Sequence, residues 1–233
     1  MAKEVVGGVS SSMLGMLADL FLKLKSGAIT ERELERFTNR QNPFEIVENL
    51  LAEWQRFYAK VFGIQISQVD LSGIRIPIER QGFGWLVVML QGMTARRLFD
   101  KCRERFGTWR YNEGEDLDKV VKSDRTAKDC PYAVWFRDRV EADEELKSKS
   151  ADNLKQAGVQ GITLEERLLL ELFYYWKTGK HLDLKNVTLC SGSRHSDGCV
   201  PGVCWVGYCD RLSVCWYDPV DAVGSIRSRQ AVS

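Results

Sequence analysis

The sequence lacks a long apolar run and an excess of charge of either sign. The apolar stretch near the middle of the chain, residues 85–90, is far shorter than the about 20 residues that a membrane-spanning helix needs. The chain has 33 lysines and arginines against 32 acidic residues, which gives a formal net charge of +1. This balance excludes a general attraction to nucleic acid or to an anionic membrane, so binding of either requires a local patch.

The sequence also lacks an export signal and a C-x-x-C pair. Asp19 and Lys23 interrupt the apolar segment near the N-terminus, and no small-residue cleavage site follows, so we expect no signal peptide. The cysteines number seven, which is odd, and we expect their thiols to stay reduced in the cytoplasm. The missing C-x-x-C pair argues against disulfide-exchange chemistry.

What the sequence does contain is an ordinary globular composition and clear helix signals. Of its 233 residues, 44% are hydrophobic and 28% charged, so it can build a core without metals or disulfides. Residues 10–12 and Thr30 offer N-caps for two helices, and Asn42 caps a third helix that Gly63 ends. We therefore predict a helical N-terminal unit over residues 1–63.

The pattern changes to β-type alternation at Ile64. Residues 85–90 suit a buried strand, a helix runs from Thr94 to near Phe106, and a second helix begins at Thr163. We predict an α+β fold in which the three-helix unit is followed by a mixed β-sheet with two main helices and a C-terminal β-hairpin. The predicted domains are residues 1–63, an α+β domain over residues 64–219 and a flexible tail over residues 220–233.

The densest group of reactive residues runs from Cys190 to Cys215. Five of the seven cysteines and one of the two histidines lie there. Zinc prefers four ligands in two close pairs, and this spacing supplies no C-x2-C pair, so we expect structural thiols, no bound metal and no cofactor. If residues 207–210 form the hairpin loop, Cys204 and Cys215 lie on the face opposite to the hairpin tryptophans.

The loop over residues 191–198 carries small residues, hydroxyls, an arginine and a carboxylate. Such a loop can bind an anion, but Asp197-Gly198 is also an ordinary turn signal, and we favour the turn. A Ser–His–Asp catalytic set is weaker still, because nothing marks a nucleophile elbow, and we predict no catalytic residue. The binding residues predicted here and on the hairpin are Ser193, Arg194, His195, Asp197, Trp205 and Trp216.

The helix that starts at Thr94 concentrates positive charge, with Trp109 and Tyr111 close behind it. Cations interleaved with aromatic residues are typical of nucleic-acid-binding surfaces. The simpler interpretation is an amphipathic helix with a solvated basic side, which the near-neutral total charge favours. The cations of the alternative nucleic-acid site are Arg96, Arg97, Lys101, Arg103, Arg105 and Arg110.

The last predicted helix is apolar on nearly every side. From Leu168 to Trp176, only Glu171 carries a charge. A helix of this kind is either buried on several sides or part of an interface. Self-association or an unknown protein partner at this helix is therefore one prediction, and an ordinary core position is the other.

Several segments in the second half of the chain form a specific pattern: R-D-R-V-E-A-D-E-E-L, G-I-T, T-G-K-H-L-D, C-S-G-S-R, V-P and W-Y-D-P. This pattern resembles an uncharacterised family of hypothetical proteins from small-genome, uncultivated bacteria. The likeness covers roughly residues 80–219, and residues 29–44 look like a helical start shared more widely among such proteins. The resemblance implies a bacterial, cytoplasmic origin, and it implies no activity, cofactor or site residue.

Taken together, these patterns favour a non-enzymatic binding or interaction module. The apolar helix and the hairpin tryptophans motivate this prediction. One alternative is a nucleic-acid-binding protein that uses residues 94–111. Another is a zinc-binding or enzymatic site in the loop and hairpin over residues 190–215.

Overall fold

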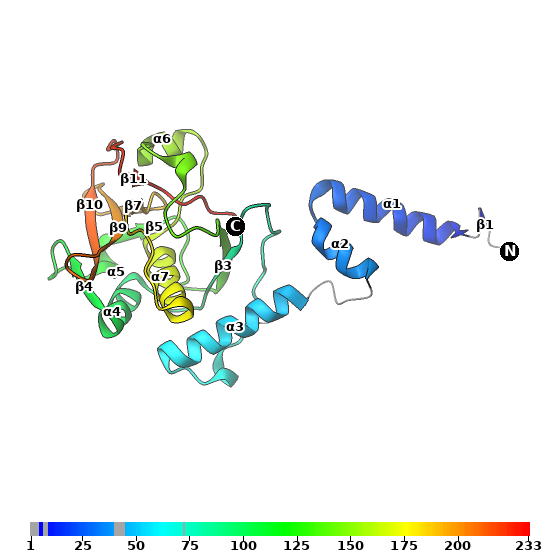
Figure 1. Ribbon diagram of the computed structural model, residues 1–233, viewed down its shortest axis with the longest axis horizontal. Helices are drawn as coiled ribbons and strands as arrows, with labels where there is room; N and C mark the ends of the chain where they lie inside the picture. The colour runs from blue at the N-terminus through cyan, green and yellow to red at the C-terminus, as the bar shows by residue number, and fades with distance from the viewer. Residues whose placement is uncertain (1–4, 7–8, 40–44, 72) are drawn as a thin grey trace. The chain divides into compact units, whose positions relative to one another are not determined.

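The computed structural model describes residues 5–6, 9–39, 45–71 and 73–233 (Figure 1). It divides into an N-terminal unit over residues 1–50 and a main unit over residues 51–233. Within the described residues, no helix has both the length and the apolar character needed to cross a membrane.

The N-terminal unit holds a short strand pair and two capped helices. β1 (Val5–Val6) pairs antiparallel with β2 (Val9–Ser10), and α1 (Ser11–Ser26) and α2 (Glu31–Thr38) follow. The predicted caps are confirmed, because Ser10 accepts a hydrogen bond from the first turn of α1 and Thr30 forms a capping box with Glu33. Gly27 ends α1 with a φ of 73°, a conformation that glycine adopts without strain.

The C-terminal half of α3 (Glu45–Phe62) belongs to the core of the main unit. The Trp54 indole and the Tyr58 hydroxyl donate hydrogen bonds of 3.0 and 2.6 Å to backbone carbonyls of β3 (Trp85–Met89). The Trp54 ring also stacks on Phe173, with ring centroids 4.1 Å apart. These contacts place the boundary between the units near residue 50 rather than at the predicted residue 63. The predicted cap Asn42 lies outside the described residues.

A mixed sheet of five strands is the largest sheet of the main unit. Its strand order is β11-β7-β9-β10-β4, with β9 antiparallel to β7 and β10, and with the β10–β4 and β11–β7 pairs parallel. The predicted α+β fold with a C-terminal hairpin is confirmed. The five strands are β4 (Gly107–Arg110), β7 (Val187–Leu189), β9 (Val200–Val206), β10 (Arg211–Tyr217) and β11 (Ile226–Arg227).

Two antiparallel strand pairs and four helices complete the main unit, with two short 3₁₀ turns. One pair joins β3 to β6 (Tyr132–Phe136), and the other joins β5 (Val121–Ser123) to β8 (Ser193–His195). The helices are α4 (Ala95–Arg105), α5 (Leu117–Val120), α6 (Ala151–Gln156) and α7 (Leu164–Thr178), and the turns are Ile66–Gln68 and Glu144–Leu146.

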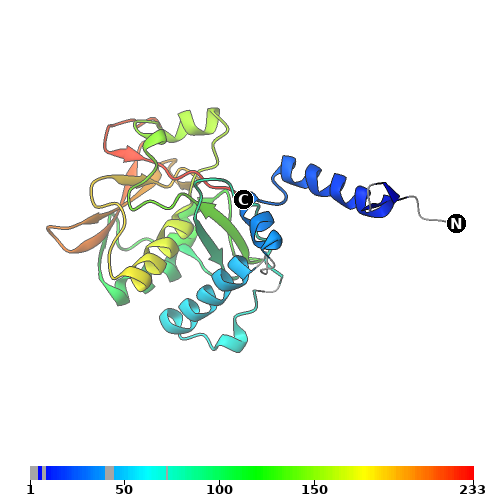
Figure 2. The same ribbon diagram turned by 45° about the vertical axis from the view of Figure 1, so that its right-hand side comes forward.

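The β9–β10 hairpin has the predicted loop at residues 207–210, and it extends from the main unit (Figure 2). Trp205 lies opposite Leu212, and Cys204 lies opposite Ser213. Because directly opposite residues share a face, Trp205 and Trp216 lie on one side of the hairpin and Cys204 on the other, as predicted. The tryptophan side packs inward, since Val203, Leu212 and Val214 are fully buried.

Helix α7 is a core helix of the main unit. Every residue from Leu164 to Tyr174 is buried, and Phe173 lies in an aromatic cluster with Trp54 and Phe57 of α3. Burial within the unit therefore explains the apolar character of residues 168–174, while Tyr175 and Trp176 are half-buried. The buried residues 168–174 favour the second of the two predictions, an ordinary core position, for most of this helix.

The C-terminal segment differs from the predicted flexible tail. Ile226 belongs to β11, Val232 exchanges backbone hydrogen bonds with Trp135, and Arg229 is only 1% exposed. The Arg229 guanidinium donates to the Asp183 carboxylate at 2.8 Å. Residues 226–232 are thus fixed by partners 39 or more positions away along the chain, which the local composition does not reveal.

Candidate functional site at helix α4

Helix α4 presents a basic side to solvent because its apolar side is fixed in the core. Thr94 caps the helix by accepting a hydrogen bond from the Arg97 backbone N–H. Leu98, Phe99 and Cys102 are buried, and the Cys102 thiol lies 3.9 Å from a backbone carbonyl of α7. The exposed side then carries the cations at the intervening positions, as an amphipathic helix requires.

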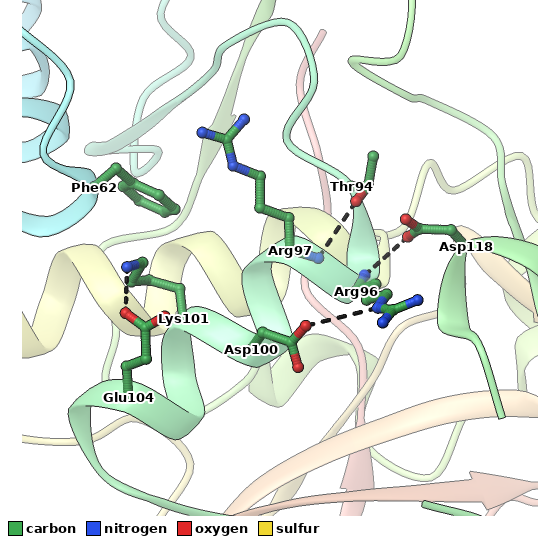
Figure 3. A pocket seen from close by; sticks show the side chains of 8 residues that line it. All are labelled: Phe62, Thr94, Arg96, Arg97, Asp100, Lys101, Glu104 and Asp118. Atoms are coloured by element: carbon green, nitrogen blue, oxygen red, sulfur yellow. Dashed lines mark hydrogen bonds and ion pairs between the residues drawn. The ribbon is translucent and has the colours of Figure 1, made fainter. Parts of the chain in front are cut away.

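A hollow of about 420 Å³ opens along this basic side (Figure 3). Three of the predicted cations line it, together with three carboxylates, the helix cap and one aromatic ring. The lining residues are Phe62, Thr94, Arg96, Arg97, Asp100, Lys101, Glu104 and Asp118. We call this hollow the α4 pocket.

Two of the three cations in the α4 pocket are paired with acids. The Arg96 guanidinium lies 3.7 Å from the Asp100 carboxylate, and Lys101 forms an ion pair with Glu104. Asp118 accepts a hydrogen bond of 2.8 Å from the Arg96 backbone N–H at the start of α4. The pocket therefore holds ions of both signs, most of them neutralised locally.

Arg97 is the exception among these cations. Its guanidinium donates to the Gly92 carbonyl oxygen at 3.3 Å and lies 5.8 Å from the centroid of the Phe62 ring. No carboxylate pairs with it in the described part of the chain. Figure 3 shows its side chain extending on the Phe62 side of the helix, away from Asp100 and Asp118. Arg97 thus offers an uncompensated positive charge to the pocket.

Phe62 is one of the pocket residues that the sequence did not indicate. It is the last residue of α3, and its ring also lies 5.7 Å from the Lys101 ammonium group. Its position just before Gly63 predicts only the end of a helix. Nothing in the sequence relates it to cations that lie 35 and 39 positions further along the chain.

The other three predicted cations do not line the α4 pocket. Arg103 pairs with Asp100 at 3.0 Å on the exposed side of α4. Arg105 donates to the carbonyl oxygens of Lys60 and Val61 at the end of α3, where a cation also interacts favourably with the helix dipole. Arg110 is 7% exposed and donates to two backbone carbonyls of the loop that follows β4.

The loop over residues 191–198 does not assemble a catalytic set. The Ser193 side chain is 1% exposed, and its hydroxyl lies 2.7 Å from the Ser123 hydroxyl and accepts from the Leu164 N–H at 2.9 Å. Ser123 in turn donates to the Glu165 carboxylate at 2.6 Å. This hydrogen-bonded chain joins β5 and β8 to the start of α7, and it leaves Ser193 without His195 as a partner.

The structure brings together three of the predicted loop and hairpin residues. His195 lies 2.8 Å from the Asp197 carboxylate and 3.3 Å from that of Glu115, and its ring centroid is 4.6 Å from that of Trp216. A backbone hydrogen bond from Cys199 and the contact with His195 lower the pKa of Asp197. The cluster fastens the 111–116 loop to the sheet.

Arg194 and Trp205 lie apart from this cluster. Arg194 donates to backbone carbonyls of its own loop, and its guanidinium is 3.9 Å from Asp152. The Trp205 ring stacks on His181 at a centroid distance of 3.3 Å, and His181 lies 2.8 Å from the buried Glu171 carboxylate. The stacking of Trp205 on His181 fixes the hairpin against the core.

The thiols form no metal centre in the part of the chain that the structure describes. All seven cysteines are free, and no group of three or more potential ligands is placed around one point among the described residues. Burial and the neighbouring Cys215 raise the pKa of Cys204 to about 11, and burial also raises the pKa of Cys190. These thiols are therefore protonated near neutral pH and poorly suited to metal binding or nucleophilic attack.

Comparisons of the chain with protein-family models, with curated proteins and with solved structures find no match. The assignment of a function therefore depends on geometry. The α4 pocket combines a hollow, three of the predicted cations and a guanidinium that no carboxylate pairs with among the described residues.

Proposed function

We propose that the protein is a non-enzymatic binding module that takes phosphate-bearing ligands in the α4 pocket. The observation that carries this proposal is Arg97, a guanidinium that no carboxylate of the described residues pairs with, in a hollow of about 420 Å³. Arg96 and Lys101 line the same hollow and supply two further donors. Guanidinium groups recognise phosphate oxygens through paired, charge-assisted hydrogen bonds.

The acids in the pocket do not prevent such binding. In the Arg96–Asp100 pair the side chains are 61% and 47% exposed, and Glu104 is 62% exposed in its pair with Lys101. Exposed pairs of this kind contribute about 0–1 kcal/mol each, because water screens both charges. A phosphate group can therefore replace a carboxylate at small cost, while the acids limit affinity for anions that carry less charge.

The composition of the pocket lining is also consistent with a binding role. None of its lining residues is a histidine or a cysteine, and the Thr94 hydroxyl is occupied as the helix cap. The pocket supplies charge and hydrogen-bond donors without a general base next to a nucleophile. The proposal includes a bacterial, cytoplasmic location, where seven free thiols stay reduced.

The first prediction tests this proposal with pyrophosphate as the ligand. We expect pyrophosphate to bind at low salt and to bind more weakly as salt rises, because screening reduces each charged contact. Arg97→Ala should weaken binding about tenfold or more, since a hydrogen bond to a charged group contributes about 1.5–3 kcal/mol. Isothermal titration calorimetry at two salt concentrations measures both effects.

Arg103→Ala is the matched control for Arg97→Ala. Arg103 is an exposed arginine on the same helix, and it does not line the α4 pocket. We expect its removal to change pyrophosphate affinity by less than about twofold, since screening weakens exposed charges at a distance. Equal losses in both variants would point to general charge rather than a site, and absence of pyrophosphate binding at low salt would disprove the proposed function.

A further inference from the structure

The aromatic wall of the α4 pocket is rigidly held. Behind the Phe62 ring lie Phe57 and Tyr58, with ring centroids 5.8 and 5.5 Å away, and both of these side chains are 0% exposed. The Tyr58 hydroxyl is itself fixed by its hydrogen bond to the Val88 carbonyl. The half-buried Phe62 ring therefore has a fixed position at the edge of the hollow.

Two cations lie beside this ring. The Arg97 guanidinium and the Lys101 ammonium group are 5.8 and 5.7 Å from the Phe62 centroid. A ligand group held by these cations is thus within a few ångströms of an aromatic surface. Binding of inorganic phosphate alone makes no use of such a surface, because phosphate has no apolar part to place against it.

The chemistry that uses both features is that of a nucleotide. Its phosphate groups pair with cations, and its base stacks on an aromatic side chain, which is the arrangement found where proteins bind nucleotides in single strands. A hollow of about 420 Å³ is also within the range of about 300–1,000 Å³ that small-molecule sites occupy.

We propose that the α4 pocket binds a nucleotide unit, with its phosphate groups at Arg97 and Lys101 and its base against Phe62. This inference rests on the proposed function and identifies the ligand class of the same pocket. The same chemistry is presented by a free nucleotide and by a nucleotide within a single strand. The acids that line the pocket favour a ligand that also gains from stacking over one that relies on charge alone.

The second prediction compares ADP with pyrophosphate, which carries the same number of phosphate groups and no base. We expect wild-type protein to bind ADP about tenfold more tightly, because stacking of one base contributes about 1–3 kcal/mol. Phe62→Leu keeps an apolar side chain of similar volume but removes the ring. It should remove most of the advantage of ADP, whereas pyrophosphate, which has no base to stack, should lose much less affinity. Calorimetric titration of both ligands into both proteins measures this difference.

Two further measurements make the result decisive. Phe62→Trp enlarges the stacking surface and should retain or strengthen ADP binding, which separates stacking from damage to the fold. A ten-residue oligo(dA) strand is titrated in parallel. If the strand binds more tightly than ADP and this binding depends on Phe62, the pocket recognises nucleotides within a single-stranded nucleic acid. If ADP binds more tightly than the strand, the pocket recognises the free nucleotide.

The failures of the two proposals are distinguishable. If pyrophosphate and ADP bind wild-type protein equally, or if Phe62→Leu weakens both to the same degree, the nucleotide inference is overturned and phosphate binding stands. If pyrophosphate does not bind wild-type protein at low salt, the proposed function is overturned, and the nucleotide inference that rests on it is overturned as well.

Discussion

Asp183 neutralises the charges of two buried arginines, and its own backbone adopts a conformation that few residues tolerate. Its carboxylate accepts from Arg167 at 2.9 Å and from Arg229 at 2.8 Å, and all three side chains are at most 1% exposed. Its φ is 53°, in the left-handed region where asparagine and aspartate are the most tolerated non-glycine residues. Burial makes each of these charges costly unless its partner is present.

The third prediction follows at Asp183. Asp183→Asn keeps the shape and suits the positive φ, but it leaves two buried guanidinium groups with one fewer negative charge. We expect a loss of about 3–5 kcal/mol in the free energy of unfolding, the range for breaking a buried ion pair. Urea denaturation measures it. Asp210→Asn is the control, because Asp210 also has a positive φ of 49° but lies exposed in the hairpin loop; a comparable loss there would contradict the explanation.

Glu165 gives a fourth prediction, on pH dependence. Burial raises the pKa of this carboxyl above its ordinary value, although the Ser123 hydroxyl donates to it. The folded state then binds its proton more tightly than the unfolded state, so this group's stabilising contribution is full below about pH 4.3 and declines as pH rises through the folded pKa. Glu165→Gln keeps an acceptor for Ser123 and removes the charge. We expect the variant to be more stable than wild type at pH 7, with the difference shrinking toward pH 4, in urea titrations; a variant less stable at pH 7 would contradict this.

At the scale of elements, caps and apolar stripes determine where helices begin and which side is buried. Thr30 and Thr163 each form a capping box, and both helices start within one residue of the prediction. On α4, the apolar positions Leu98 and Phe99 face the core, so the basic side is exposed by default. Local patterns were sufficient for these features because each depends on residues within about one helical turn.

Helix α7 supplies the fifth prediction. Leu172 is 2% exposed in the core, so Leu172→Glu should abolish stable folding of the main unit rather than convert an oligomer into a monomer. Burial of an unpaired charge costs several kcal/mol, which is a large part of a domain's stability. Circular dichroism and light scattering distinguish the outcomes. Leu184→Glu, at a site 55% exposed, should fold normally. A well-folded, soluble Leu172→Glu monomer would show that α7 is an interface after all.

At the scale of the whole molecule, contacts between distant segments override local composition. The segment over residues 220–233 looked like a flexible tail, yet Ile226 and Arg229 are buried against β7 and Asp183. In the same way, α3 looked like part of a separate helical unit, whereas Trp54 stacks on Phe173, more than a hundred positions further on. Both differences arise because burial depends on which segments meet, and single-sequence periodicity contains no such pairing.

In the candidate site, too, some features are set by the sequence and others by the tertiary structure. The sequence by itself determined that α4 is amphipathic, that its basic side carries Arg96, Arg97 and Lys101, and that the β9–β10 hairpin separates its tryptophans from Cys204. Only the tertiary structure decided which of these cations has no carboxylate partner among the described residues and which aromatic ring lies beside it. Charge and periodicity are properties of neighbouring residues, so a sequence can specify them. Compensation of a charge and the shape of a pocket depend on three-dimensional proximity, which the packing of α3 on α4 and β3 creates.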